Sequence, residues 1–135
     1  MTETNEPQPT ETPYQRLGGE DGVRQLVLRF YEIMNELPEA RGIRKMHAAD
    51  LGGATEKLFK FLSSWLGGPD LFVEEYGHPR LRARHFPFRI GLDERNQWML
   101  CMDKALDDTP MDDDLRELLR QALGQTATHM INHQA

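Results

Sequence analysis

The stretch "RLRARHFPFRIG", residues 80–91, combines four arginines and one histidine with a proline that would break a helix. We expect one short helix from Leu81 to His85, stopped by Pro87. His85 would then lie in the last turn, where backbone carbonyls lack helical partners. Such a carbonyl can hold one ring nitrogen of an imidazole and leave the other nitrogen for a metal ion.

These residues permit two interpretations of His85. A haem would suit the stretch, because it combines an iron, a flat apolar ring that Phe86 and Phe88 can enclose, and two carboxylates that arginines can meet. The other interpretation is a partly exposed histidine in a surface turn with salt bridges. Taken alone, the stretch favours the surface turn.

The rest of the chain has the apolar spacing of amphipathic helices. Stripes of apolar residues at intervals of three and four run through 23–34, 54–65, 98–106 and 115–130. Alternating strand patterns are essentially absent, so the pattern predicts an all-α fold with four substantial helices. The link from Gly67 to Asp93 is long for a compact helical domain, yet too apolar for disorder. We expect it to be ordered. The acidic run at 107–114 is interpreted as a loop and a helix cap.

The composition bounds the class of protein. At 135 residues the chain has the size of one domain and can bury a core without disulfides. Its formal net charge of −6 argues against nonspecific nucleic-acid binding. The single cysteine excludes intramolecular disulfides and cysteine-based zinc sites. No apolar run approaches the roughly 20 residues that span a bilayer, so no membrane partner is expected.

The N-terminal segment, residues 1–12, is rich in Pro, Thr and Glu. It is too polar to pack, and we expect a disordered tail there. It has neither a basic start nor an apolar stretch, so it does not have the pattern of a signal peptide. We therefore expect a cytoplasmic protein whose one folded domain covers residues 13–135.

Four segments of the chain match those of one known family. They are "RFYEIM" (29–34), "KLFKFLSSWLGGP" (57–69), "EEYGHPRLRARHFPF" (74–88) and "ERNQWMLCM" (94–102). From about Pro13 to His133, the chain resembles the group II (O-type) truncated haemoglobins of bacteria. The resemblance implies a two-over-two helical globin that encloses haem b, and it reverses the interpretation of His85.

The resemblance also implies roles for individual residues. His85, in the family's "RHxPF" segment, would be the proximal ligand of the iron. Tyr31 and Trp98 would be hydrogen-bond donors on the distal side, where the diatomic ligand binds. Ala54 would be the usually small residue of the distal helix, followed one turn later by Leu58.

The residues that would contact the haem propionates are assigned less specifically than the iron ligand and the distal residues. Arg84 and Lys57 are candidates for the haem propionates. An arginine beside a proximal histidine can equally make a solvated salt bridge, and both interpretations stay open.

One segment departs from the family. Relatives often have Tyr-Pro ahead of the "DL" that precedes the distal helix, but here residues 44–51 read "RKMHAADL". With a shift of one residue, His47 takes the place of that tyrosine; without it, Met46 does. We favour His47 as the third polar distal residue. If His47 reached the iron, the ligand-free haem would become six-coordinate.

The function that the resemblance implies is reversible binding of dioxygen, with nitric oxide, carbon monoxide and peroxide as further ligands. The rival is a haem redox enzyme, a nitric-oxide dioxygenase or a peroxidase-like protein. It would need a separate reductase, because the sequence shows no flavin or nicotinamide domain. A haem-based sensor and a haem-free helical adaptor are weaker alternatives. The sequence leaves open whether the protein is a monomer or a homodimer.

Overall fold

The computed structural model describes residues 11–133, and within this range the chain is helical without strands. The helices are α1 (Pro13–Leu17), α2 (Gly19–Glu36), α3 (Arg41–Lys45), α4 (Gly52–Trp65), α5 (Leu71–Tyr76), α6 (Leu81–His85), α7 (Leu92–Asp108) and α8 (Asp113–His129), with a 3-10 turn, η1 (Pro38–Ala40), after α2. Among the described residues, no helix has the length and apolar character needed to cross a membrane.

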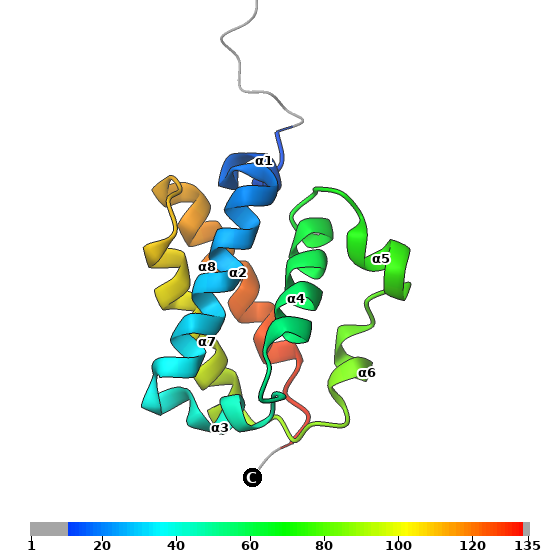
Figure 1. Cartoon of the computed structure of the whole chain (residues 1–135), viewed down its shortest axis with the longest axis vertical. Helices are drawn as coiled ribbons and strands as arrows, with labels where there is room; N and C mark the ends of the chain where they lie inside the picture. The colour runs from blue at the N-terminus through cyan, green and yellow to red at the C-terminus, as the bar shows by residue number, and fades with distance from the viewer. Residues whose placement is uncertain (1–10, 134–135) are drawn as a thin grey trace, which may run out of the picture.

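The four long helices α2, α4, α7 and α8 form the body of the molecule (Figure 1). Helix α2 packs against both α4 and α7, and α7 packs against α8. The apolar stripes of the sequence point into the space that they share, where Phe30, Met102 and Leu115 are fully buried. Burying one such side chain contributes roughly 1.5–3 kcal/mol. The prediction of four substantial helices is confirmed.

Capping side chains set the first residues of α1 and α8. Thr12 accepts a hydrogen bond from the backbone N–H of Gln15 and so caps α1. Residues 1–10 of the predicted tail lie outside the described residues. Asp112 caps α8 through the N–H of Leu115, at 2.7 Å. The acidic run differs partly from expectation, because α7 continues to Asp108 before the loop begins.

The long link between α4 and α7 runs along the outer side of α4 (Figure 1). It contains the expected short helix, α6, at Leu81–His85. It also contains α5, which the sequence analysis missed. Helix α5 has six residues and one buried side chain, Phe72, which is too little for a periodic signal. None of the residues of α6 is buried.

Candidate functional site

His85 ends α6 with its ring held by the backbone. Its Nδ1 lies 2.7 Å from the carbonyl oxygen of Leu81, one turn earlier. A carbonyl only accepts hydrogen bonds, so Nδ1 carries the proton and Nε2 keeps its lone pair in the neutral ring. This is the arrangement that a metal-binding imidazole requires.

Hydrogen bonds from long side chains, rather than apolar packing, hold α6 in place. The Arg82 guanidinium donates to the carbonyl oxygens of His129 and Ile131, at 3.1 Å each. The side-chain amide of Asn132 donates to the carbonyl oxygens of His85 (3.2 Å) and Phe88 (2.9 Å). The end of α8 and the segment after it thus fix the position of His85.

The Arg84 side chain contacts α5 and the residues that follow it, rather than α8. Its guanidinium donates to the carbonyl oxygens of Pro79 (2.6 Å), Tyr76 (2.9 Å) and His78 (3.3 Å), and it lies 5.2 Å from the centre of the Phe72 ring. These contacts tie α6 to α5. The expected bond from Arg84 to a haem propionate therefore stays a prediction, beside a structural role that the sequence did not indicate.

Tyr31 and His47 are in contact and form a second part of the candidate site, separate from the segment that carries His85. Tyr31, on α2, is 8% exposed, and its hydroxyl donates to the carbonyl oxygen of Ala54 on α4 at 3.4 Å. The rings of Tyr31 and His47 meet edge to face with centroids 5.8 Å apart. Burial raises the pKa of Tyr31 well above its usual range, so the hydroxyl keeps its proton and remains a donor.

His47 is oriented by a hydrogen bond within its own segment. Its Nδ1 lies 2.8 Å from the carbonyl oxygen of Ile43, which leaves Nε2 as the acceptor of the neutral ring. Met46 packs against the apolar core instead. His47 and Met46 are the two candidates for the position of the family's third distal residue. Of these two, His47 is the one that contacts Tyr31.

Two residues that the sequence analysis missed position this segment. The Arg44 guanidinium donates to the carbonyl oxygens of Ala48 (3.0 Å) and Ala49 (2.9 Å). The side-chain carbonyl of Gln97, on α7, accepts from the backbone N–H of Ile43 at 3.0 Å. Single polar side chains of this kind leave no periodic signal in a sequence.

Trp98 joins the same group through an aromatic contact. Its ring lies 5.1 Å from that of Phe30, which in turn meets Tyr31 edge to face at 4.9 Å. Trp98 is half-buried on α7, so the cluster Tyr31, His47 and Trp98 draws on three different parts of the chain. Chain order alone does not bring these residues together.

Helix α4 contributes the remaining predicted residues. Ala54 and Leu58 are half-buried against the core, and Ala54 presents its carbonyl oxygen to Tyr31. Lys57 is exposed, and its ammonium lies 5.5 Å from the centre of the Tyr76 ring. The contact of Lys57 with a propionate stays a prediction.

The apolar surface near His85 fits a large flat apolar group. Phe86, Phe88 and Leu92 are 56%, 43% and 64% exposed and lie within eight residues of His85. Large apolar side chains that stay exposed so close together in the sequence suit the binding of an apolar group. With the Nε2 lone pair of His85 at one end of this segment, the residues present suit a haem.

Comparison with known proteins decides the family. The family model described as bacterial-like globin matches residues 12–132. The chain belongs to that family. The globin family implies haem binding.

Individual relatives are similar over nearly the whole length. The chain is 40% identical to the Group 2 truncated hemoglobin YjbI of Bacillus subtilis, over 89% of this chain and 88% of the relative. Among solved structures, the cold-adapted truncated hemoglobin of the Antarctic marine bacterium Pseudoalteromonas haloplanktis TAC125 is 50% identical, with a TM-score of 0.90, over 92% of this chain and 100% of the other. The Group II 2-on-2 hemoglobin of the plant pathogen Agrobacterium tumefaciens is 43% identical, with a TM-score of 0.91, over 96% and 100%.

These similarities confirm the expected fold class, the two-over-two truncated globin. In this bacterial-like globin, α2 and α4 pack together as one pair of long helices, and α7 and α8 as the other. Tyr31 and Ala54 come from the first pair, Trp98 comes from the second, and His85 comes from the link outside both.

Proposed function

We propose that this globin binds haem b through Nε2 of His85 and binds dioxygen reversibly, with nitric oxide and carbon monoxide as further ligands. The observation that carries the proposal is the hydrogen bond between Nδ1 of His85 and the carbonyl oxygen of Leu81, at 2.7 Å. It sets the tautomer in which Nε2 is free to bind a metal ion. When bound, the haem supplies the iron at which a diatomic ligand is held.

The residues around Tyr31 would decide how firmly that ligand is held. The hydroxyl of Tyr31, whose pKa is raised by burial, and the indole N–H of Trp98 both keep their protons at neutral pH and can donate them. A hydrogen bond to a ligand with partial negative charge contributes about 1.5–3 kcal/mol, which is roughly 10- to 100-fold in dissociation rate. We therefore expect slow release of dioxygen.

His47 has a different role from these two donors. Because its Nδ1 proton is engaged by the Ile43 carbonyl, the neutral ring beside Tyr31 can act only as an acceptor through Nε2. It can accept a hydrogen bond from the Tyr31 hydroxyl when no ligand is bound, and it donates to a ligand only after Nε2 is also protonated. The same lone pair would allow His47 to complete six-coordination when no diatomic ligand is present.

Two absorption spectra test the proposal, those of the ferric and ferrous protein beside a His85→Ala variant. We expect haem bands that shift with oxidation state and that are lost or altered in the variant. His78→Ala is the matched control, since His78 is an exposed histidine of the same link, and its bands should match the wild type. If added haemin keeps the spectrum of free haemin, the proposal is overturned, and unchanged bands in His85→Ala would exclude His85 as the ligand.

A second measurement separates binding from redox catalysis. A binding globin consumes no more than one equivalent of nitric oxide per haem. Sustained consumption with a reductase and a reduced nicotinamide would favour the rival function, nitric-oxide dioxygenation.

A further inference from the structure

Positive charge is concentrated on the segment that carries His85. Residues 76–92 contain four arginines and no Asp or Glu. The other residues of the chain have 12 Lys and Arg against 22 Asp and Glu, a net −10 beside the +4 of this segment. The four arginines are Arg80, Arg82, Arg84 and Arg89.

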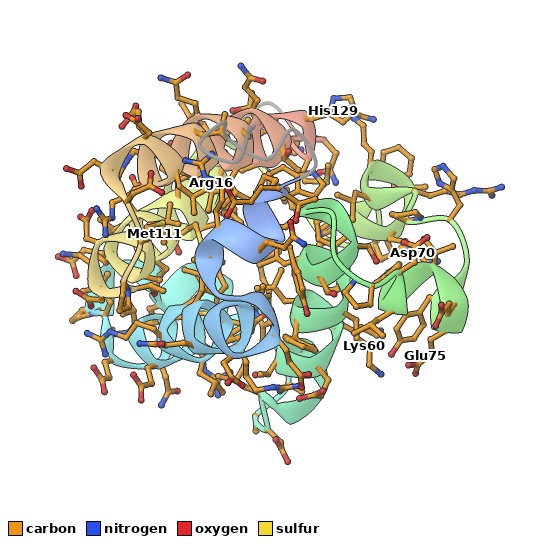
Figure 2. The ribbon with its side chains drawn as sticks, turned by 90° about the horizontal axis from the view of Figure 1, so that it is seen from above. Arg16, Lys60, Asp70, Glu75, Met111 and His129 are labelled. Carbon is orange, nitrogen blue, oxygen red and sulfur yellow. The ribbon has the colours of Figure 1, made fainter. Side chains whose placement is uncertain are left out.

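The fold places a second segment without carboxylates beside the first. Residues 118–133, at the end of α8 and beyond, also lack Asp and Glu. The bonds from Arg82 to the carbonyl oxygens of His129 and Ile131 join the two segments. Figure 2 shows His129 at the end of α8 that lies toward α6. We call the surface formed by Arg80, Arg82 and Arg89 with His129 and His133 the basic face; the Arg84 guanidinium contacts α5 instead.

The arginines of the basic face keep their charge uncompensated. All three are exposed, and across residues 11–133 none of them pairs with a carboxylate. Arg82 donates to neutral backbone carbonyls, and Arg89 contacts the ring of His133. By contrast, Arg24, Arg29 and Arg120 on the long helices all have acidic partners.

The basic face is also hollowed. A cavity of about 600 Å³ opens between α6 and the end of α8, with Arg80, Arg82 and His129 in its lining. A protruding acidic side chain of a partner can enter such a hollow and meet two guanidinium groups there.

We propose that the basic face is the docking surface for an acidic electron-donor protein that carries a flavin or an iron–sulfur cluster. This inference rests on the proposed function, because a globin whose iron has been oxidised no longer binds dioxygen. The donor's reduced centre loses one electron and the ferric iron gains it; no bond forms or breaks and no proton moves. A partner docked here lies against the helix that holds the iron's own ligand.

The charge distribution also selects the orientation of the partner. An acidic protein is attracted by the basic face and repelled by the net −10 of the remaining chain. Electrostatic complementarity of this kind speeds association by about 10- to 1,000-fold and weakens as salt is added. It favours encounters in which the redox group approaches α6 rather than the far side.

The probe for the experiment is an acidic plant-type [2Fe–2S] ferredoxin. Oxidised ferredoxin is titrated into the ¹⁵N-labelled protein, and amide shifts are mapped. The reduced ferredoxin is then mixed with the ferric haem protein, and the rate of iron reduction is followed between low and high ionic strength. We expect shifts confined to residues of α6 and the end of α8, and a reduction rate that falls steeply with salt.

The variant is Arg80→Glu/Arg89→Glu, which reverses two charges of the basic face outside the proposed haem contacts. Its reduction rate at low ionic strength should fall about tenfold or more, with a flatter salt dependence and unchanged oxygen binding. Lys104→Glu is the control for one reversed charge outside the basic face, since Lys104 is exposed on α7 twelve residues from Leu92, roughly 18 Å along the helix. On a logarithmic scale it should reduce the rate by much less than half the effect of the double variant.

Several outcomes would overturn the inference. If only net charge mattered, Lys104→Glu, which changes the net charge by −2, would lose half as much on a logarithmic scale as the double variant, which changes it by −4; that result would overturn the inference. Shifts from duplex DNA or anionic vesicles at the basic face, with none from ferredoxin, would assign it to another class of partner. Amide mapping also works on protein without haem, so failure to bind haem and failure to dock are separate results.

Discussion

The body of four long helices and the outlying helix α6 are stabilised by different interactions. The body buries its apolar stripes, and side chains such as Phe30 are completely inaccessible to water. Helix α6 buries no residue and is held by arginine and asparagine side chains that bond to backbone carbonyls. The comparison teaches that the candidate iron ligand and the distal residues depend on separate interactions, and that each can be weakened without the other.

The largest expected effect is a loss of stability when a buried side chain of the body is removed. Phe30→Ala removes a fully buried ring that also contacts Tyr31 and Trp98, and we expect a loss of about 3–5 kcal/mol in the free energy of unfolding. Phe86→Ala makes the same chemical change at a ring that is 56% exposed and should cost below about 1 kcal/mol. Urea denaturation of the haem-free proteins measures both. Similar losses for the two variants would contradict the contrast between the body and α6.

The buried thiol of Cys101, in the body, should make the stability of the folded protein fall at alkaline pH. Burial raises the pKa of the Cys101 thiol to about 11 from 9.0, so the unfolded chain releases this proton first. Stability that is fully present below pH 9 is therefore lost as pH rises toward 11, by about 2–3 kcal/mol from this group. Tyr31, whose pKa burial also raises, adds a loss at still higher pH.

Denaturation curves between pH 8 and 11 check this for the wild type and Cys101→Ala. The variant should lose a constant amount of stability to its small cavity but show a flatter decline with pH. An equal decline in both proteins would exclude Cys101 as its source.

The distal residues provide a smaller effect. Tyr31→Phe deletes one donor while it keeps the buried ring, and oxygen dissociation should become about tenfold faster or more. Stopped-flow displacement of dioxygen by carbon monoxide measures the rate. Tyr14→Phe is the control, since Tyr14 is half-buried on α1 and should leave the rate unchanged. No change in Tyr31→Phe would remove Tyr31 from the distal site.

The smallest expected effect is local to α6. Arg84→Gln removes the guanidinium that holds three carbonyls before the helix, so we expect α6 to open more easily by about 1 kcal/mol. Its amides should then exchange hydrogen about fivefold faster, whereas those of α2 should not change. Arg80→Gln is the control, since Arg80 is an exposed arginine of the same link whose backbone N–H contacts His78. Faster exchange throughout the protein would show that α6 and the body unfold together.

The sequence by itself determined the parts of the fold that bury apolar side chains at regular intervals. Periodicity reports which face of a helix leaves water, and it predicted four long helices whose stripes form the core. Pro87 and the residues before it likewise predicted α6. The pattern missed α5, where only Phe72 is buried, because one side chain makes no period.

The tertiary structure decided how the candidate site is assembled. The resemblance to the family named Tyr31, Trp98 and His85, but the placement of His47 against Tyr31 depends on Arg44 and Gln97. Polar side chains that bond to backbone N–H or carbonyl groups follow no repeating spacing, so their partners become visible only when the chain is folded. The same reason hid the bonds that hold α6 and the joining of two carboxylate-free segments into one basic face.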